Sequence, residues 1–351
     1  MVSGPYYHCL TFSLLLIPPL IFASYLLAAF PNPPEALNVH PSLASLPPSA
    51  KSWQIYPEDF YEGGAYVEFP YGRMRYWIMG PEKGKKVVLI HGLSIPAIVW
   101  KDVAPRLAAK GYRVLLYDLY GRGYSDAPQT TYHPGLFSTQ LALLMQHLKW
   151  DKAIIVGVSM GGGVAAAFTA HFPELVDDKV VLIASAGLVE VRERPISSGN
   201  GDISRTAKFM SSPLVQTLAS SVPFRKYLQH LTNSSTKPGD EVDPIVEIVR
   251  VQSAHLPGYN AAISSSLRDG PIRGQAAMFA SSGFEGKKVL LIHGTKDTTV
   301  QPKYSPRIIE LLPEKTKKSA RLVNVEDAGH DVITTHSRIV TDELVKFFKE
   351  K

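Results

Sequence analysis

The sequence predicts an α/β fold with a mostly parallel sheet that is covered by helices on both faces. Short apolar runs alternate with stretches of helical pattern, and each run is continuously apolar, as in strands that are buried on both faces. The succession of strand, helix and strand requires crossover connections, which build a parallel sheet. The 351 residues are 45% hydrophobic and 19% charged, which suits one large core with an insertion.

The amino-terminal stretch Cys9–Phe30 carries no charge. A helix needs about 20 apolar residues to cross the hydrocarbon layer, so residues 1–30 predict an uncleaved membrane anchor and a single-pass protein of an endomembrane. The alternative is a cleaved signal peptide and a secreted protein, although no Lys or Arg precedes Lys51. Residues 31–50 are rich in proline and predict a stiff, extended spacer.

The strands of the sheet are expected after residue 64. Ala65–Phe69 and Arg73–Met79 flank a Pro-Tyr-Gly turn and predict an antiparallel hairpin at the edge of a mixed sheet. The buried strands are expected at Val87–Ile90, Val114–Tyr117, Ile154–Val156, Val180–Ile183, Val289–Ile292 and Arg321–Val325. Helices are expected between them at Ala97–Lys110, Gly135–Trp150 and Met160–Phe172.

Residues 157–161 read Gly-Val-Ser-Met-Gly and lie between an apolar run and a helix rich in small residues. In a G-x-S-x-G elbow the serine lies on a cramped strand-to-helix turn, where side chains two residues before and after it would collide with backbone. Gly157 and Gly161 remove this collision. The amino end of the helix also offers N–H groups and partial positive charge to an oxyanion. Ser159 is therefore the candidate nucleophile.

The alternation of apolar strands and helical stretches stops between Val189 and Gly286. This stretch is far longer than the about 2–6 residues usual for a loop between a strand and a helix. We therefore expect a helical cap at 190–283, inserted into a core formed by 51–189 and 284–351. The apolar stripe of Met210, Leu214 and Leu218 would pack on the core or line a hydrophobic pocket, and Asn233 begins a glycosylation sequon. Cap helices are expected at Ser204–Ser220, Phe224–Leu231, Pro244–His255 and Asn260–Asp269.

A base and an acid are expected near Ser159. His330 lies in the loop after the strand Arg321–Val325, and Asp297 lies in the loop after the preceding strand. The carboxyl ends of parallel strands meet at one edge of a sheet, so these side chains should converge there. His330 would act as the base, and Asp297 would orient its imidazole. Glu190, after an earlier strand, is the alternative acid.

From about residue 64 to 351 the chain resembles the α/β-hydrolase superfamily. The resemblance rests on the elbow, on the order Ser, Asp, His along the chain, on His91-Gly92-Leu93-Ser94, and on residues 118–126, which read Asp-Leu-Tyr-Gly-Arg-Gly-Tyr-Ser-Asp. It implies an α/β-hydrolase fold, a mostly parallel eight-stranded sheet with an inserted helical cap. It also implies an oxyanion hole formed by the N–H groups of Leu93 and Met160. Ser94 replaces a proline found in many members, which leaves Ser94 as an alternative donor.

Several polar residues of the same motifs are expected to be structural. His91 should form a hydrogen bond that shapes the oxyanion loop. Asp118, Arg122 and Asp126 should stabilise their own loop. No cluster of His, Cys and carboxylates indicates a metal, and no cofactor is expected.

These features predict a serine hydrolase that cleaves the carboxylic ester of a hydrophobic or lipid substrate through an acyl-enzyme on Ser159, with a resemblance to monoacylglycerol lipases. Carbon–carbon bond hydrolases and thioesterases share the serine elbow and stay open, as does a non-catalytic, ligand-binding homologue. Epoxide hydrolases and haloalkane dehalogenases of this fold need an aspartate at the elbow and are disfavoured. The expected partners are therefore a small ester or lipid and the membrane.

The charge distribution argues against a nucleic-acid-binding protein, and the cysteine content argues against a fold held by disulfides. The formal net charge is +6, but the basic residues are spread along the chain. The densest run (Lys315, Lys317 and Lys318) has no aromatic residues between its cations, so binding of nucleic acid is not expected. Cys9 is the only cysteine of the sequence, which excludes an intramolecular disulfide.

Overall fold

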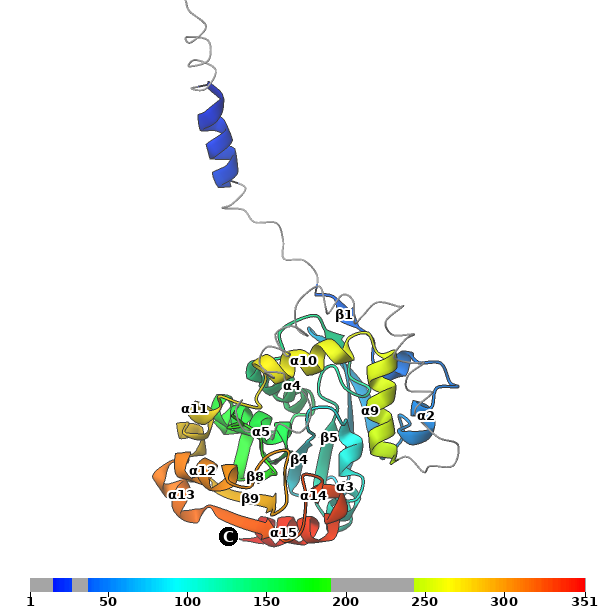
Figure 1. The fold of residues 1–351 in the computed structure, drawn as a ribbon, viewed down its shortest axis with the longest axis vertical. Coiled ribbons are helices and arrows are strands. Elements are labelled where there is room, and N and C mark those ends of the chain that lie inside the picture. Colours follow the sequence, from blue (N-terminus) through cyan, green and yellow to red (C-terminus); the bar gives the residue numbers. More distant parts are fainter. Residues whose placement is uncertain (1–14, 27–36, 191–242, 351) are drawn as a thin grey trace, which may run out of the picture. The chain divides into compact units, whose positions relative to one another are not determined.

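The computed structural model describes residues 15–26, 37–190 and 243–350 of the chain. The chain divides into two units, Met1–Asn38 and Val39–Lys351. In the first unit the described residues 15–26 form a helix, and the second unit contains a large sheet with helices (Figure 1). Cys9 and residues 27–36, on which parts of the anchor and spacer predictions fall, lie outside the described residues.

The predicted membrane anchor is wrong. None of the helices in the described parts of the chain has both the length and the apolar character that a membrane span requires. The prediction counted uncharged residues over Cys9–Phe30, but a span needs about 20 residues in one helix, and the described helix covers only 15–26. The predicted single-pass endomembrane localisation and the membrane as a partner are withdrawn with it.

Part of the segment expected as an extended spacer is packed into the second unit. Strand β1 (Val39–His40) pairs antiparallel with β6 (Ala127–Pro128). The short 3-10 helix η1 (Leu43–Ser45) follows, and its Leu43 side chain is fully buried. The Leu43 N–H donates to the Gly123 carbonyl at 3.0 Å. Leu43 therefore anchors this part of the chain to the globular unit.

Within the described residues the main sheet has eight strands in the order β10-β9-β8-β7-β4-β5-β3-β2. Strand β3 is antiparallel to both of its neighbours, and the other pairs are parallel. The predicted mixed sheet with an edge hairpin is confirmed. The strands are β2 (Gly64–Phe69), β3 (Gly72–Met79), β4 (Lys86–Ile90), β5 (Arg113–Tyr117), β7 (Ala153–Val158), β8 (Val176–Ile183), β9 (Lys288–Gly294) and β10 (Arg321–Val325).

Helices cover both faces of this sheet, as predicted. Along β4, Val87 and Leu89 belong to one hydrophobic core, whereas Val88 and Ile90 belong to the other. Burial on both faces is the reason that the strand reads as a continuous apolar run. One face is covered by α4 (Pro134–His147), α5 (Met160–His171), α11 (Ala276–Phe279) and α12 (Tyr304–Leu311), and the other by α3 (Ala104–Ala109) and α15 (Ser337–Lys349).

The helix predicted at Ala97–Lys110 is interrupted. It consists of a 3-10 helix, η2 (Ala97–Trp100), and the separate helix α3. Pro105 explains the break, because in one continuous helix its ring would clash with the carbonyl of Lys101. The other short helices described are α2 (Ser52–Ile55), η3 (Pro173–Leu175), η4 (Ser282–Phe284), α13 (Glu314–Ser319) and α14 (Val332–Thr335).

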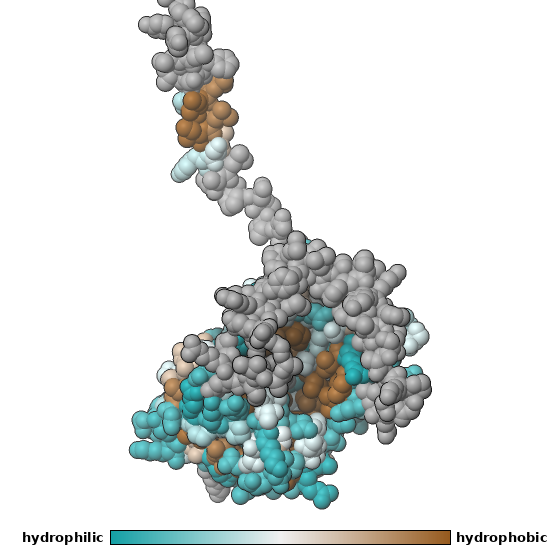
Figure 2. Space-filling view, viewed as in Figure 1, coloured by the Kyte–Doolittle hydropathy of each residue, from teal (hydrophilic) through white to brown (hydrophobic). Residues whose placement is uncertain are grey.

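The predicted helical insertion lies between β8 and β9. Its described part includes α9 (Pro244–His255), which has the predicted bounds, and α10 (Tyr259–Asp269), which begins one residue earlier than predicted. Figure 2 shows hydrophobic side chains gathered between these two helices. Other predicted features lie outside the described residues, namely the helices Ser204–Ser220 and Phe224–Leu231, the stripe from Met210 to Leu218 and the sequon at Asn233.

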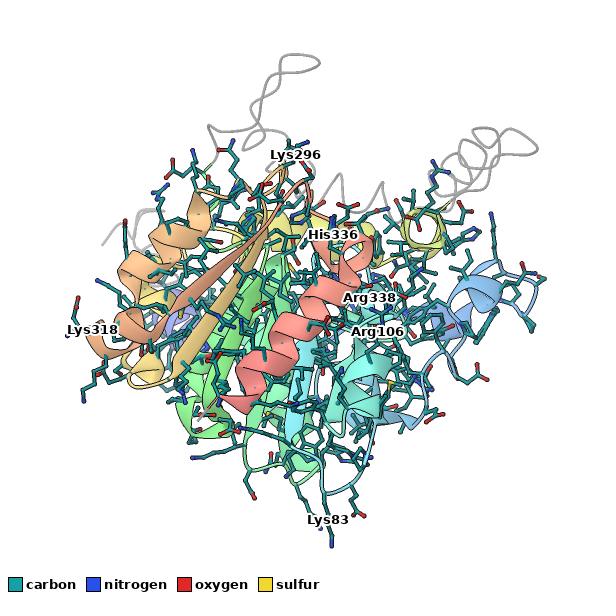
Figure 3. The ribbon with its side chains drawn as sticks, turned by 90° about the horizontal axis from the view of Figure 1, so that it is seen from below. Lys83, Arg106, Lys296, Lys318, His336 and Arg338 are labelled. Carbon is teal, nitrogen blue, oxygen red and sulfur yellow. The ribbon has the colours of Figure 1, made fainter. Side chains whose placement is uncertain are left out.

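Basic side chains are distributed over the second unit. In Figure 3, Lys83, Lys296 and Lys318 lie at widely separated points of the molecule. Arg106 of α3, Lys110 and Arg338 of α15 line one surface groove, and the carboxylate of Asp342 lines the same groove. This groove therefore presents mixed charge.

Candidate active site

Ser159 lies at the turn between β7 and α5, with φ 55° and ψ −122°. A positive φ is unusual for a residue with a side chain, and such strain persists only where the surroundings hold it. The Ser159 N–H donates to the Ile183 carbonyl at 2.9 Å, and the Ser159 carbonyl accepts from the Ala186 N–H at 3.0 Å. The end of β8 and the residues after it thus hold the turn in this conformation.

Two glycines make room for the turn. A Cβ at Gly157 would lie 2.1 Å from the Gly161 carbonyl oxygen, and a Cβ at Gly161 would lie 2.4 Å from the Ile90 carbonyl oxygen. These neighbours are backbone atoms, which cannot rotate away. The glycines therefore relieve the collisions that the G-x-S-x-G pattern led us to expect.

A Gly157→Ala variant should unfold at a lower temperature and lose most of the ester hydrolysis expected of Ser159, because the new methyl group forces the turn apart. Overpacking of this kind typically costs about 1–3 kcal/mol. Gly135→Ala in α4 is the matched control, since its Cβ meets only the flexible His133 side chain and alanine favours a helix. Thermal unfolding and ester hydrolysis should be measured for both variants. Equal stability and activity of the two variants would contradict this account of the elbow.

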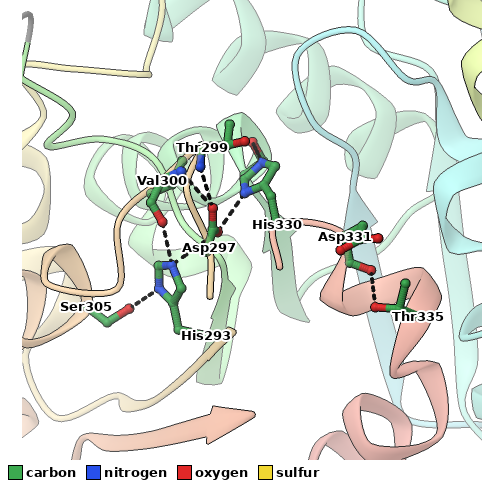
Figure 4. A network of polar contacts seen from close by, with 9 residues as sticks. His293, Asp297, Thr299, Val300, Ser305, His330, Asp331 and Thr335 are labelled. Carbon is green, nitrogen blue, oxygen red and sulfur yellow. Dashed lines mark hydrogen bonds and ion pairs between the residues drawn. The ribbon is translucent and has the colours of Figure 1, made fainter. Parts of the chain in front are cut away.

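The structure brings the three predicted catalytic side chains together. The His330 Nε2 lies 2.9 Å from the Ser159 Oγ. Figure 4 shows the other side of the imidazole, where the His330 Nδ1 lies 2.8 Å from the Asp297 Oδ2. An ionised carboxylate can only accept, so the imidazole proton is on Nδ1 and is donated to Asp297. The Nε2 is then free to accept the Ser159 hydroxyl proton.

The loops that carry Asp297 and His330 are joined by backbone hydrogen bonds. The Thr295 N–H donates to the Val325 carbonyl at 3.0 Å, and the Lys296 N–H donates to the Ala328 carbonyl at 2.9 Å. Strands β9 and β10 are parallel neighbours, so both loops leave the sheet at the same edge. This pairing fixes the distance between the carboxylate and the imidazole.

The Asp297 carboxylate is buried and held by four donors. Its Oδ1 accepts from the N–H groups of Thr299 and Val300 at 2.8 and 2.9 Å, and its Oδ2 lies 3.3 Å from the His293 Nε2. Burial acts to raise the pKa of Asp297, but the hydrogen bonds from His293, His330 and Val300 outweigh it and hold the pKa well below its ordinary value. Asp297 is thus ionised throughout the neutral range.

His293 is a site residue that the sequence reasoning missed. Its Nε2 faces two acceptors, the Val300 carbonyl at 2.8 Å and the Asp297 Oδ2, so this nitrogen carries the proton. Its Nδ1 then accepts from the Ser305 hydroxyl at 2.7 Å. The signal available in the sequence was its place at the end of a buried strand, four residues before Asp297.

Glu190, the alternative acid, is engaged elsewhere. Its Oε1 lies 2.8 Å from the Arg307 Nη2, and its side chain is 49% exposed. The Nδ1 of His330 is bonded to Asp297 instead. The geometry therefore favours Asp297 over Glu190 as the residue that orients the base.

The predicted oxyanion residues lie beside Ser159. A Cβ at Gly92 would be 3.4 Å from the Ser159 Cβ, and Leu93, Ser159 and Met160 line one cavity of about 120 Å³. Met160 is the first residue of α5, so its N–H has no partner within the helix. Across residues 37–190 and 243–350, the N–H groups of Leu93 and Ser94 are not donated to any group. These N–H groups are available to a ligand.

His91 shapes this loop in the way expected. It is fully buried, and burial lowers its pKa to about 3, so the ring is neutral. Its Nε2 accepts from the Leu119 N–H at 2.8 Å, which leaves the proton on Nδ1. The Nδ1 donates to the Gly92 carbonyl at 2.9 Å. Both ring nitrogens of His91 are thus engaged with backbone groups, and the side chain orients the loop.

Asp118 joins the same loop to its neighbours. It accepts from the N–H groups of Ala97 and Tyr124, both at 2.8 Å, and from the Tyr56 hydroxyl at 3.1 Å. Complete burial raises its pKa to about 7, although these hydrogen bonds lower it. Asp126 accepts from the Arg73 N–H at 3.0 Å. Both carboxylates stabilise the loop, as expected from the sequence.

In the parts of the chain that the structure describes, no group of three His, Cys, Asp or Glu side chains is placed to hold a metal ion.

The strand order, the elbow after β7 and the helical insertion after β8 together define a fold of the α/β-hydrolase type. Residues 85–337 match the family described as alpha/beta hydrolase fold. The match covers most of the chain, and the chain therefore belongs to this family.

The chain is similar in sequence or in fold to several described proteins. An uncharacterized protein of Mycobacterium tuberculosis is 35% identical over 107 residues, which cover 30% of the chain but only 31% of that protein. The 2-hydroxy-6-oxo-6-(2'-aminophenyl)hexa-2,4-dienoic acid hydrolase of Metapseudomonas resinovorans is 29% identical over 76% of the chain and 83% of its own length. The carboxylesterase CesB of Bacillus subtilis superposes with a TM-score of 0.61 at 17% identity, covering 85% of the chain and 95% of CesB.

Proposed function

We propose that the protein is a serine hydrolase that cleaves a carboxylic ester through an acyl-enzyme on Ser159. The observation that carries the proposal is the continuous path from the Ser159 Oγ through the two nitrogens of His330 to the Asp297 carboxylate, with contacts of 2.9 and 2.8 Å. A neutral imidazole in this tautomer is a base for the hydroxyl, and a buried, ionised carboxylate stabilises the imidazolium that forms.

In the first half of the reaction the Ser159 Oγ attacks the acyl carbon, and its proton passes to the His330 Nε2. The carbonyl oxygen becomes an oxyanion that accepts from the N–H groups of Met160 and Leu93, with Ser94 as the alternative to Leu93. When the carbon–oxygen bond breaks, the leaving alkoxide takes the proton from Nε2. An acyl-enzyme and an alcohol result.

In the second half a water attacks the acyl carbon while its proton passes to the His330 Nε2. The bond to the Ser159 Oγ then breaks, and the Oγ recovers the proton from Nε2. The carboxylic acid leaves, and the site returns to its starting state. His330 is 27% exposed, so water and product have access to the reacting atoms.

We further propose that the acyl group is short and apolar. The cavity at Ser159 has a volume of about 120 Å³, somewhat less than a cavity of about 150 Å³ that admits benzene. Glu190, Arg273 and Thr299 add polar groups at its lining. The core and the cap, for which we propose the bounds 190–283, both contribute to the apolar lining, which consists of Leu93, Met160, Ala186, Val189, Leu267, Ile272 and Val300.

A carbon–carbon bond hydrolase using the same three residues is the second candidate. It is favoured by the 29% identity with the dienoic acid hydrolase, a relative that the chain matches over 83% of its length. In that reaction a carbon leaving group, instead of an alkoxide, would take the proton from His330. The two candidates differ in the leaving group and share the nucleophile.

A panel of substrates tests the proposal on the purified chain. We expect p-nitrophenyl esters to be hydrolysed, with acetyl and butyryl esters preferred over palmitoyl esters because the cavity is small. Mass spectrometry of the quenched reaction should find the acyl group on the peptide that contains Ser159. Cleavage of a vinylogous 1,5-diketone without cleavage of any ester would select the second candidate. Cleavage of neither would overturn both.

A further inference from the structure

We infer that the cap helices α9 and α10 position the oxyanion loop, defined here as residues 92–95, through Gln252, Tyr259 and Ser266. The inference rests on the proposed function, because the orientation of this loop affects the rate only if Ser159 attacks a carbonyl. These three side chains are positioning residues. They act on the reaction through the backbone of the loop and do not touch the reacting atoms.

Two cap side chains hold the carbonyl of Ser94. The Tyr259 hydroxyl donates to it at 2.9 Å, and the Gln252 Nε2 donates to it at 3.3 Å. Tyr259 and Gln252 are buried, so water competes little for these bonds. Burial also raises the pKa of Tyr259 above its ordinary value, which keeps the hydroxyl protonated as a donor.

A third cap side chain acts through Arg122. The Arg122 Nε donates to the Leu93 carbonyl at 2.8 Å, and its Nη1 donates to the Tyr120 carbonyl at 2.9 Å. Its Nη2 donates to the Ser266 hydroxyl of α10 at 2.7 Å. Burial lowers the pKa of Arg122 to about 10, so it stays a cation at neutral pH. Ser266 thus fixes the guanidinium that orients the loop.

Gln252 bonds both to the oxyanion loop and to the turn that carries Arg122. Its Oε1 accepts from the Gly123 N–H at 2.7 Å, while its Nε2 reaches Ser94. One amide of α9 therefore bridges the turn that carries Arg122 and the oxyanion loop. A displacement of α9 would move both partners.

Peptide geometry turns the bonds to the Gly92 and Leu93 carbonyls into an orientation of the candidate N–H donors, whereas the bonds from Tyr259 and Gln252 to the Ser94 carbonyl hold the next peptide of the loop, between Ser94 and Ile95. In a trans peptide the N–H points away from the preceding carbonyl. The bond from His91 to the Gly92 carbonyl orients the Leu93 N–H, and the bond from Arg122 to the Leu93 carbonyl orients the Ser94 N–H. Both candidate donors are fixed before the substrate arrives, which is how an oxyanion hole stabilises a transition state without reorganisation.

The test compares hydroxyl deletions in the cap. Tyr259→Phe and Ser266→Ala should each lower kcat about 3–30-fold with KM unchanged, less than the about 10²–10³-fold loss on deleting an oxyanion donor itself. Ser253→Ala is the matched control on α9, because its hydroxyl bonds only within the cap, to the Asn260 Oδ1 at 2.9 Å. It should keep the wild-type kcat. Thermal unfolding of each variant checks that the fold is retained.

A trifluoromethyl ketone separates positioning from a general structural role. It forms a tetrahedral oxyanion on Ser159, so its inhibition constant should rise in Tyr259→Phe and Ser266→Ala in step with the loss of kcat. Acylation and deacylation both pass through an oxyanion, so both steps should slow together and the KM for the ester should stay constant. A structural defect of the cap would raise KM or affect Ser253→Ala equally.

The outcomes distinguish this inference from the proposed function. Wild-type kcat in Tyr259→Phe and Ser266→Ala, with an active parent, would overturn the role of the cap and leave the serine hydrolase standing. An equal loss in Ser253→Ala, or a loss confined to KM, would also overturn the inference. A parent that neither hydrolyses esters nor binds the ketone would overturn the proposed function together with the inference.

Discussion

The Ser159→Ala variant is expected to hydrolyse esters about 10⁵–10⁶-fold more slowly than the parent, a loss of the size measured when a protease triad loses its serine. The substitution removes the atom that attacks the acyl carbon in the first half of the reaction, and the His330 Nε2 loses its partner at 2.9 Å. The remaining N–H groups could still bind a carbonyl but could not form an acyl-enzyme. Steady-state hydrolysis and labelling with a fluorophosphonate probe measure the loss.

Ser185→Ala is the matched control for this experiment. Ser185 is buried beside α5, where its Oγ would lie 2.2 Å from a Cβ at Gly162, and it donates to the Ala186 carbonyl. The control should keep the probe labelling, whereas Ser159→Ala should show none and should unfold at the parent's temperature. Labelling that persists in Ser159→Ala would assign the nucleophile to another residue.

The Asp297→Asn variant is expected to lose about 10⁴-fold in kcat, as in a protease triad with the same change. The N–H groups of Thr299 and Val300 would hold the amide oxygen at the place of Oδ1. The amide NH₂ would then face the His330 Nδ1 and donate to it. The imidazole proton would move to Nε2, which could no longer accept the proton of Ser159.

Glu190→Gln tests the alternative acid in the same assay. Because Glu190 pairs with Arg307, its substitution should cost far less than Asp297→Asn. The pH dependence of kcat should also be measured for each variant, because the depressed pKa of Asp297 keeps its carboxylate ionised at mildly acidic pH. A near-parental rate in Asp297→Asn with a large loss in Glu190→Gln would transfer the role to Glu190.

Local sequence patterns predicted much of the fold because strand burial and turn sterics depend on residues that are close together in the sequence. Continuous apolar runs indicated the buried strands, and glycine at 157 and 161 indicated a turn without room for a Cβ. The places of Asp297 and His330 followed from topology, since parallel strands end at one edge of the sheet. The anchor prediction failed because apolar composition over Cys9–Phe30 does not establish one helix long enough to cross a membrane.

By itself the sequence determined the alternation of buried strands and helices, the cramped serine turn and the strand ends that carry the acid and the base. Only the tertiary structure decided the contacts between distant segments. These include the bonds by which Gln252, Tyr259 and Ser266 of the cap position the oxyanion loop and Arg122. The physical reason is that strand burial and turn sterics are local along the chain, whereas a buried donor finds its acceptor only after packing sets their distance.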